Sequence, residues 1–166
     1  MESNLKRKVL LSNSSFVCTM LTLMVFVAII AFTYRTSSGI AFVLCCLLIC
    51  IAILISLFYI PMSVEVTPDY LFINRALRKK SFPIKKIKEI LPVSVPADAL
   101  RLCGSGGFMG YWGWYKADSI GRYFAYYGRS SDCFLITLDN DKKYLLGCQE
   151  SEDICNFIHT CIKPEF

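Results

Sequence analysis

Two long apolar runs near the start of the chain constrain its fold more than any other feature. Residues 16–34 and 40–60 carry no charged side chain, and Arg35 is the only charge between the start of the first run and the end of the second. At about 1.5 Å per residue, each run makes roughly 28 to 32 Å of helix, which matches the hydrocarbon core of a bilayer. The sequence therefore predicts two membrane-spanning helices.

The segment between the two runs, residues 35–39, is Arg-Thr-Ser-Ser-Gly and suits a tight turn at a membrane surface. The helices should therefore run antiparallel, as a hairpin over residues 16–60. A cleaved signal peptide is the competing interpretation, because Lys6, Arg7 and Lys8 precede the first run. That run is longer than the apolar region of a signal, and a second span comes directly after it.

Charge around the hairpin predicts its orientation. Three basic residues lie in the N-terminal segment, residues 1–15, whereas the loop between the helices holds only Arg35. Basic segments tend to stay on the cytoplasmic side of a membrane. We therefore expect a multi-pass protein of the inner (cytoplasmic) membrane with both termini in the cytoplasm.

The remainder of the chain, residues 63–166, has a balanced charge and is long enough for one domain. Side-chain alternation and turn residues predict short strands over residues 64–67, 70–74, 80–84, 88–91, 111–116, 123–127, 133–138 and 142–148. The first two ranges and the last two should form hairpins.

Periodicity changes at the end of the domain, where apolar residues recur at helical spacing over residues 154–162. Ser151 is a natural N-cap for this helix and Pro164 a natural stop. We expect Phe157 to plug the open end of a strongly bent antiparallel sheet. The predicted class is therefore α+β, a pleckstrin-homology-like (PH-like) roll behind a transmembrane hairpin.

The segment between Gly104 and Tyr127 contains six of the nine glycines and nine aromatic residues. This Gly-aromatic segment resembles a family of bacterial PH-domain proteins in which a membrane hairpin precedes the domain, and the resemblance covers residues 63–166. It implies the fold and a membrane-tethered setting, and it brings no catalytic residue. Gly128 stands where a small hydroxyl residue would be expected in relatives.

The glycines at 104–107 allow two interpretations. Glycine lets backbone N–H groups approach an anion, but no Lys-Ser or Lys-Thr follows to complete a phosphate-binding loop. Turns with positive φ or close strand contacts fit the segment better. Because aromatic side chains dominate docking surfaces, the candidate docking surface consists of Phe108, Tyr111, Trp112, Trp114 and Tyr115. The two tryptophans should share one strand face and the two tyrosines the other.

A run of seven cations without an acid precedes this segment. The candidate membrane-facing basic patch consists of Arg75, Arg78, Lys79, Lys80, Lys85, Lys86 and Lys88. Strand alternation lets about half of them face anionic lipid together, which gives roughly 3 kcal/mol. That is enough to orient a domain already tethered by helices. A solvated face is the alternative. Phosphoinositide binding by the eukaryotic route is not expected, because the turn at residues 67–70 carries no cation.

These features predict a membrane-anchored PH-like interaction or scaffold module that binds a protein partner, a second copy of itself or the anionic lipid surface. The alternative is an enzyme that pairs a domain cysteine with His159, since Cys155 lies four residues before it. We expect no metal and no cofactor, because no cysteine pair has CxxC spacing. We expect no nucleic acid partner, because no cations are interleaved with the aromatic residues.

Overall fold

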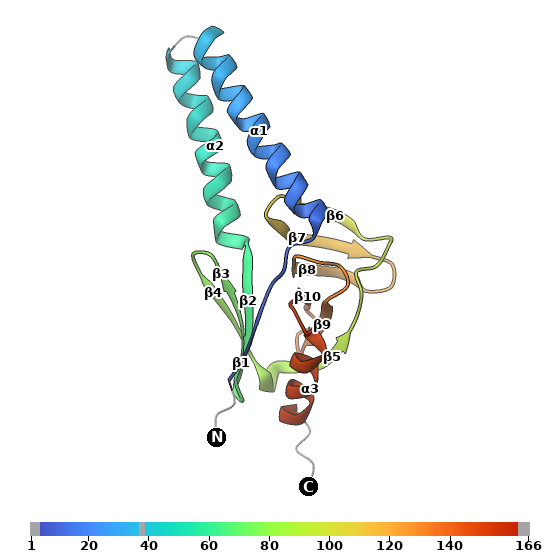
Figure 1. The fold of residues 1–166 in the computed structure, drawn as a ribbon. Coiled ribbons are helices and arrows are strands. Elements are labelled where there is room, and N and C mark those ends of the chain that lie inside the picture. Colours follow the sequence, from blue (N-terminus) through green and yellow to red (C-terminus); the bar gives the residue numbers. More distant parts are fainter. Residues whose placement is uncertain (1–3, 37–38, 163–166) are drawn as a thin grey trace.

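Two long helices stand at one end of the molecule in the computed structural model, which describes residues 4–36 and 39–162 (Figure 1). Helix α1 covers Asn13–Thr36 and helix α2 covers Gly39–Tyr59. Both are long and apolar enough to cross a membrane, and only a small part of each is buried against the rest of the chain. The side-chain oxygen of Ser12 accepts a hydrogen bond from the backbone N–H of Ser15 (3.2 Å) and so caps α1.

A four-stranded antiparallel sheet follows α2 directly. It consists of β1 (Leu5–Lys8), β2 (Pro61–Val66), β3 (Tyr70–Arg75) and β4 (Lys79–Pro83), in that order across the sheet. Strand β1 lies before the helices in sequence, and its pairing with β2 was not predicted. Strand β1 precedes the start of α1, and β2 follows the end of α2. Their pairing therefore links the N-terminal end of α1 to the C-terminal end of α2. Strand β1 is therefore part of the domain's first sheet.

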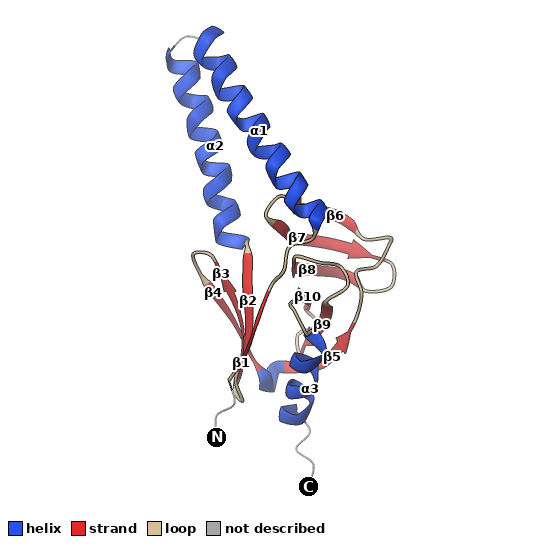
Figure 2. Ribbon diagram, in the orientation of Figure 1, coloured by secondary structure: helices blue, strands red, loops and turns tan. Residues whose placement is uncertain are grey.

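A six-stranded sheet forms the second layer (Figure 2). Its members are β5 (Ile87–Pro92), β6 (Leu100–Gly107), β7 (Gly110–Ala117), β8 (Gly121–Tyr127), β9 (Cys133–Leu138) and β10 (Lys143–Gly147). The spatial order is β5-β9-β10-β8-β7-β6, and only the β8–β10 pair is parallel. Strand β6 was not predicted, because its glycines break the apolar alternation on which the strand prediction depends. A short 3-10 helix, η1 (Ile84–Lys86), links the two sheets.

Helix α3 (Ser151–Ile162) packs against strands of both sheets and against η1. Ile154 and Ile158 are fully buried in the main core, while Phe157 is only half-buried against it. The expected plug is therefore a pair of isoleucines rather than Phe157, because Phe157 lies at the edge of the buried stripe. Pro164 lies outside the described residues. The predicted α+β class is confirmed, with two long apolar helices before a β-sheet domain and a C-terminal helix.

Candidate membrane-contact site

Strand register fixes which end of the domain lies next to the helices. Strand β2 starts at Pro61, just after α2 ends, and Pro61 pairs with Arg75 at the end of β3. The β3–β4 turn therefore lies at the helix end of the domain (Figure 1). The β2–β3 turn lies at the opposite, far end, where the backbone N–H of Ile84 donates to the carbonyl oxygen of Asp69 (2.9 Å) and holds η1 nearby.

This register divides the predicted basic patch into two groups. Arg75, Arg78, Lys79 and Lys80 lie at the helix end, whereas Lys85, Lys86 and Lys88 lie at the far end. A six-residue strand separates the groups by roughly 20 Å, which exceeds the screening length of about 8 Å at physiological salt. In addition, Lys88 forms an ion pair with Asp141, with 3.4 Å between Nζ and Oδ1. The seven cations therefore do not form one patch, and the far group cannot share a membrane surface with the near group.

Two lysines of β1 lie beside the cations at the helix end. Lys8 pairs with Ser63, Ser63 with Asn74, and Asn74 with Lys79, so that these four residues form one row across the sheet. Lys6 projects from the same face, two residues earlier in β1. From the sequence these lysines predict only the orientation of the hairpin, because nothing local indicates that β1 joins a sheet some 60 residues away.

Lys80 projects from the opposite face of β4, toward the second sheet. Its Nζ lies 4.3 Å from the ring centroid of Tyr144 and 5.5 Å from that of Phe124. Burial, followed by repulsion from Arg75, lowers the pKa of Lys80 to about 8. Lys80 therefore belongs to an aromatic crevice between the sheets and does not face a membrane surface.

The Gly-aromatic segment forms the β6–β7 hairpin, and its tip is docked on α1. The Ser15 hydroxyl donates to the carbonyl oxygen of Gly107 (2.6 Å) and accepts from the N–H of Gly110 (3.0 Å). The Thr19 hydroxyl oxygen accepts from the N–H of Met109 (2.8 Å). Gly107 has a φ of 135°, and a Cβ there would lie 3.2 Å from the Cys18 sulfur. This helix–hairpin seam needs glycine, which confirms the structural interpretation of the glycines.

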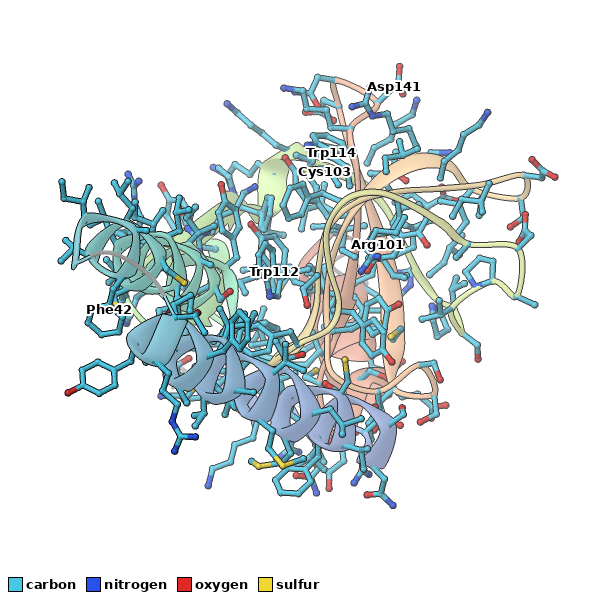
Figure 3. All side chains as sticks on the ribbon, turned by 90° about the horizontal axis from the view of Figure 1, so that it is seen from above. Phe42, Arg101, Cys103, Trp112, Trp114 and Asp141 are labelled. Carbon is cyan, nitrogen blue, oxygen red and sulfur yellow. The ribbon has the colours of Figure 1, made fainter. Side chains whose placement is uncertain are left out.

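The five candidate docking residues have different surroundings. Trp112 is 9% exposed because it stacks on Tyr59 at the end of α2, with ring centroids 5.1 Å apart. Tyr115 is 4% exposed on the other strand face, as the alternation predicted. Figure 3, which looks down the helices, places Trp112 close to the helix pair and Trp114 farther away, beside Cys103. Trp112 and Tyr115 are therefore core residues in the intact chain, which corrects their assignment to a surface.

The other three candidates are half-buried. Phe108 packs edge-on against Phe26 of α1, at 6.2 Å between ring centroids. Tyr111 stacks on Tyr127 (4.8 Å) and Trp114 meets Phe124 edge-on (5.2 Å). A binding role for these three stays a prediction.

The presence of glycine at position 128 also has a structural explanation. The chain between β1 and α1, residues 9–12, passes over the sheet, and the N–H of Ser12 donates to the carbonyl oxygen of Gly128 (2.9 Å). A Cβ at Gly128 would collide with the carbonyl oxygen of Leu10. Glycine therefore stands here because the crossing chain leaves no room for a side chain.

The predicted thiol nucleophile lacks the required environment. Cys155 is buried, and burial raises its pKa to about 11. His159 is exposed on the same helix, and no hydrogen bond joins the two side chains among the described contacts. Burial also raises the pKa of both Cys133 and Cys148 to about 12. Because the thiolate is the reactive form, these buried cysteines are packing residues.

One comparison with known proteins identifies the domain. A family model described as "Bacterial PH domain" matches residues 62–161, more than half of the chain. No curated protein and no solved structure matches the chain. The matched region begins after α2, so it includes β2 to β10 and most of α3 but leaves out β1.

Proposed function

The chain belongs to the bacterial PH domain family, and we propose that it is a membrane-anchored interaction module whose domain lies on the cytoplasmic face of the membrane and binds the anionic lipid surface there. PH domains are generally not enzymes. The observation that carries the proposal is the strand register, which gathers cations at the end of the domain next to two helices long enough to span a bilayer.

The charge at this end is sufficient for orientation. Lys8, Arg78 and Lys79 are exposed there, and each contributes about 1 kcal/mol near an anionic leaflet. The sum of roughly 3 kcal/mol corresponds to about a hundredfold preference for the lipid-contacting orientation. Leu77, at the tip of the β3–β4 turn, is 54% exposed and adds an apolar side chain between the cations. Because the helices already hold the domain at the surface, this preference needs to orient the domain and not to recruit it.

The pairing of β1 with β2 supports the proposed topology, since it keeps the N-terminal segment and the domain on one side of the membrane. Basic residues precede α1 and follow α2 in the sequence, and segments rich in basic residues tend to stay in the cytoplasm. An alkaline phosphatase reporter fused after Ser37 should be active, and one fused after Phe166 inactive. The opposite pattern of activity would overturn the orientation.

Hydrogen exchange of the full chain in nanodiscs tests the lipid contact. Amides of residues 75–79 should exchange more slowly when phosphatidylglycerol is added to phosphatidylcholine, and high salt should reverse the effect. The double variant Arg78→Ala, Lys79→Ala should lose the protection. The matched variant Lys85→Ala, Lys86→Ala removes two cations at the far end and should retain it. Equal exchange in both lipids would refute the proposal.

A second candidate function, binding of a protein partner or another copy, rests on β6. This strand is the last in its sheet, and within the described residues nothing pairs with its outer edge. Leu100 and Leu102 on this strand are 68% and 51% exposed. Free strand edges accept further strands. A bismaleimide should cross-link two chains through the exposed Cys103, and Cys103→Ser should abolish the product. The absence of this product would exclude pairing of two β6 strands.

A further inference from the structure

A groove of about 960 Å³ lies where the helices meet the four-stranded sheet. One wall is apolar and comes from the last turn of α2 and the crossing chain, including Leu57, Ile60 and Leu11. Met62 and Leu11 are 55% and 40% exposed there, although both are apolar. This wall continues the lipid-facing surface of α2 down into the domain, so the groove is open to the acyl-chain region of a bilayer.

The other wall of the groove is cationic. Lys6, Lys8 and Lys79 line it, and none of these three takes part in an ion pair within the described residues. Arg75 also borders the groove, but its guanidinium lies over the Tyr59 ring and donates to the Tyr126 hydroxyl. The nearest acid is Glu65, which is outside the lining and accepts hydrogen bonds from Asn4 (2.9 Å) and Asn74 (3.1 Å). The cationic wall therefore keeps an excess of positive charge beside an apolar surface.

Asn74 lies in the same lining, in the row that joins Lys8 to Lys79. Its side chain is about nine-tenths buried. Its Nδ2 donates to the Ser63 hydroxyl (3.1 Å) and to Glu65, but its Oδ1 is buried without a hydrogen-bond partner. A buried amide oxygen ordinarily has a donor. A residue of the groove lining thus holds one buried, unsatisfied acceptor beside the cations.

We propose that this groove binds one anionic glycerophospholipid with a hydroxylated headgroup, of the phosphatidylglycerol type. The lipid phosphate lies between Lys8 and Lys79, a headgroup hydroxyl donates to Asn74 Oδ1, and an acyl chain lies along Leu57 and Leu11. A soluble anion would satisfy the cations but leave the apolar wall in water, whereas a phospholipid matches both walls. The inference rests on the proposed membrane setting and gives the domain a defined lipid ligand in place of a diffuse surface.

Native mass spectrometry of the full chain, released from nanodiscs of equal phosphatidylglycerol and phosphatidylcholine, tests the site. One retained phosphatidylglycerol per chain is expected. Lys8→Ala with Lys79→Ala should lower its retention at least tenfold, and Lys85→Ala with Lys86→Ala should not change it. Ala76→Trp fills the groove at an exposed turn position without removing a cation, and it should also abolish retention.

Lipid chemistry provides a second arm of the test. Phosphatidylmethanol carries the same charge as phosphatidylglycerol but lacks the headgroup hydroxyls, so it should be retained less well. Equal retention of the two would overturn the contact with Asn74. Salt-sensitive protection of residues 75–79 without any retained lipid would overturn the groove site alone, whereas loss of both signals would overturn the proposed function as well.

Discussion

Ser15→Ala should loosen the helix–hairpin seam between α1 and the tip of the β6–β7 hairpin. Ser15 is fully buried, and its hydroxyl bonds both the carbonyl oxygen of Gly107 and the N–H of Gly110. Alanine keeps the backbone and removes only this hydroxyl. The Thr19 hydroxyl, 3.4 Å from the same carbonyl oxygen, can partly replace one bond, but no other side chain among the described residues bonds the Gly110 N–H.

The expected cost is that of losing both buried hydrogen bonds of this hydroxyl, about 2 kcal/mol. Because each 1.4 kcal/mol is a factor of ten, the seam should open about 30 times more often. Hydrogen exchange of residues 107–110 in nanodiscs measures this directly, and exchange there should accelerate by about that factor.

Thr33→Ala is the matched control on the same helix. The Thr33 hydroxyl donates only to carbonyl oxygens of its own helix, those of Ile29 (2.9 Å) and Ile30 (3.1 Å). Its removal should leave exchange at residues 107–110 unchanged. If Ser15→Ala changed that exchange by less than about threefold, the seam would not depend on this hydroxyl and the reasoning would be refuted.

Three further predictions concern the core and its charges. Ile158→Ala should lower the free energy of unfolding in detergent by about 2 to 5 kcal/mol. Phe157→Ala should lower it by clearly less, because Ile158 is fully buried and Phe157 only half-buried. Equal losses of unfolding free energy in the two variants would contradict the assigned plug. The Tyr59 ring covers one face of Trp112. Tyr59→Ala should therefore shift tryptophan emission to the red and increase quenching by acrylamide. An unchanged spectrum would argue against the stack. Burial lowers the pKa of Lys80 to about 8 from a usual 10.5, so above pH 8 the unfolded chain binds more protons than the folded chain. The free energy of unfolding should therefore rise with pH from about 8 toward 10. Lys80→Met should flatten this rise, and a rise that persists in the variant would assign it to other groups.

The elements that could be predicted from the amino-acid sequence are those whose signals are local. The spans at residues 16–34 and 40–60 depend on runs of apolar side chains, and helices occupy both regions. The hairpin of β9 and β10 follows from alternation around a turn, and α3 follows from a helical period that starts at Ser151. In each case the neighbours that decide the structure are within a few residues, so the pattern is visible without a fold.

Features that depend on pairing between distant residues could be seen only in the folded chain. The partner of β1 lies some 60 residues away, beyond both helices, so the sequence could not show that Lys8 and Lys79 share a row. Similarly, the alternation placed Trp112 and Trp114 on one face of a strand, but the stacking of Tyr59 decided that Trp112 is buried. Register between strands is set by packing and hydrogen bonding across the whole sheet. It therefore separates a run of seven cations into two distant groups, although the sequence presents them as one.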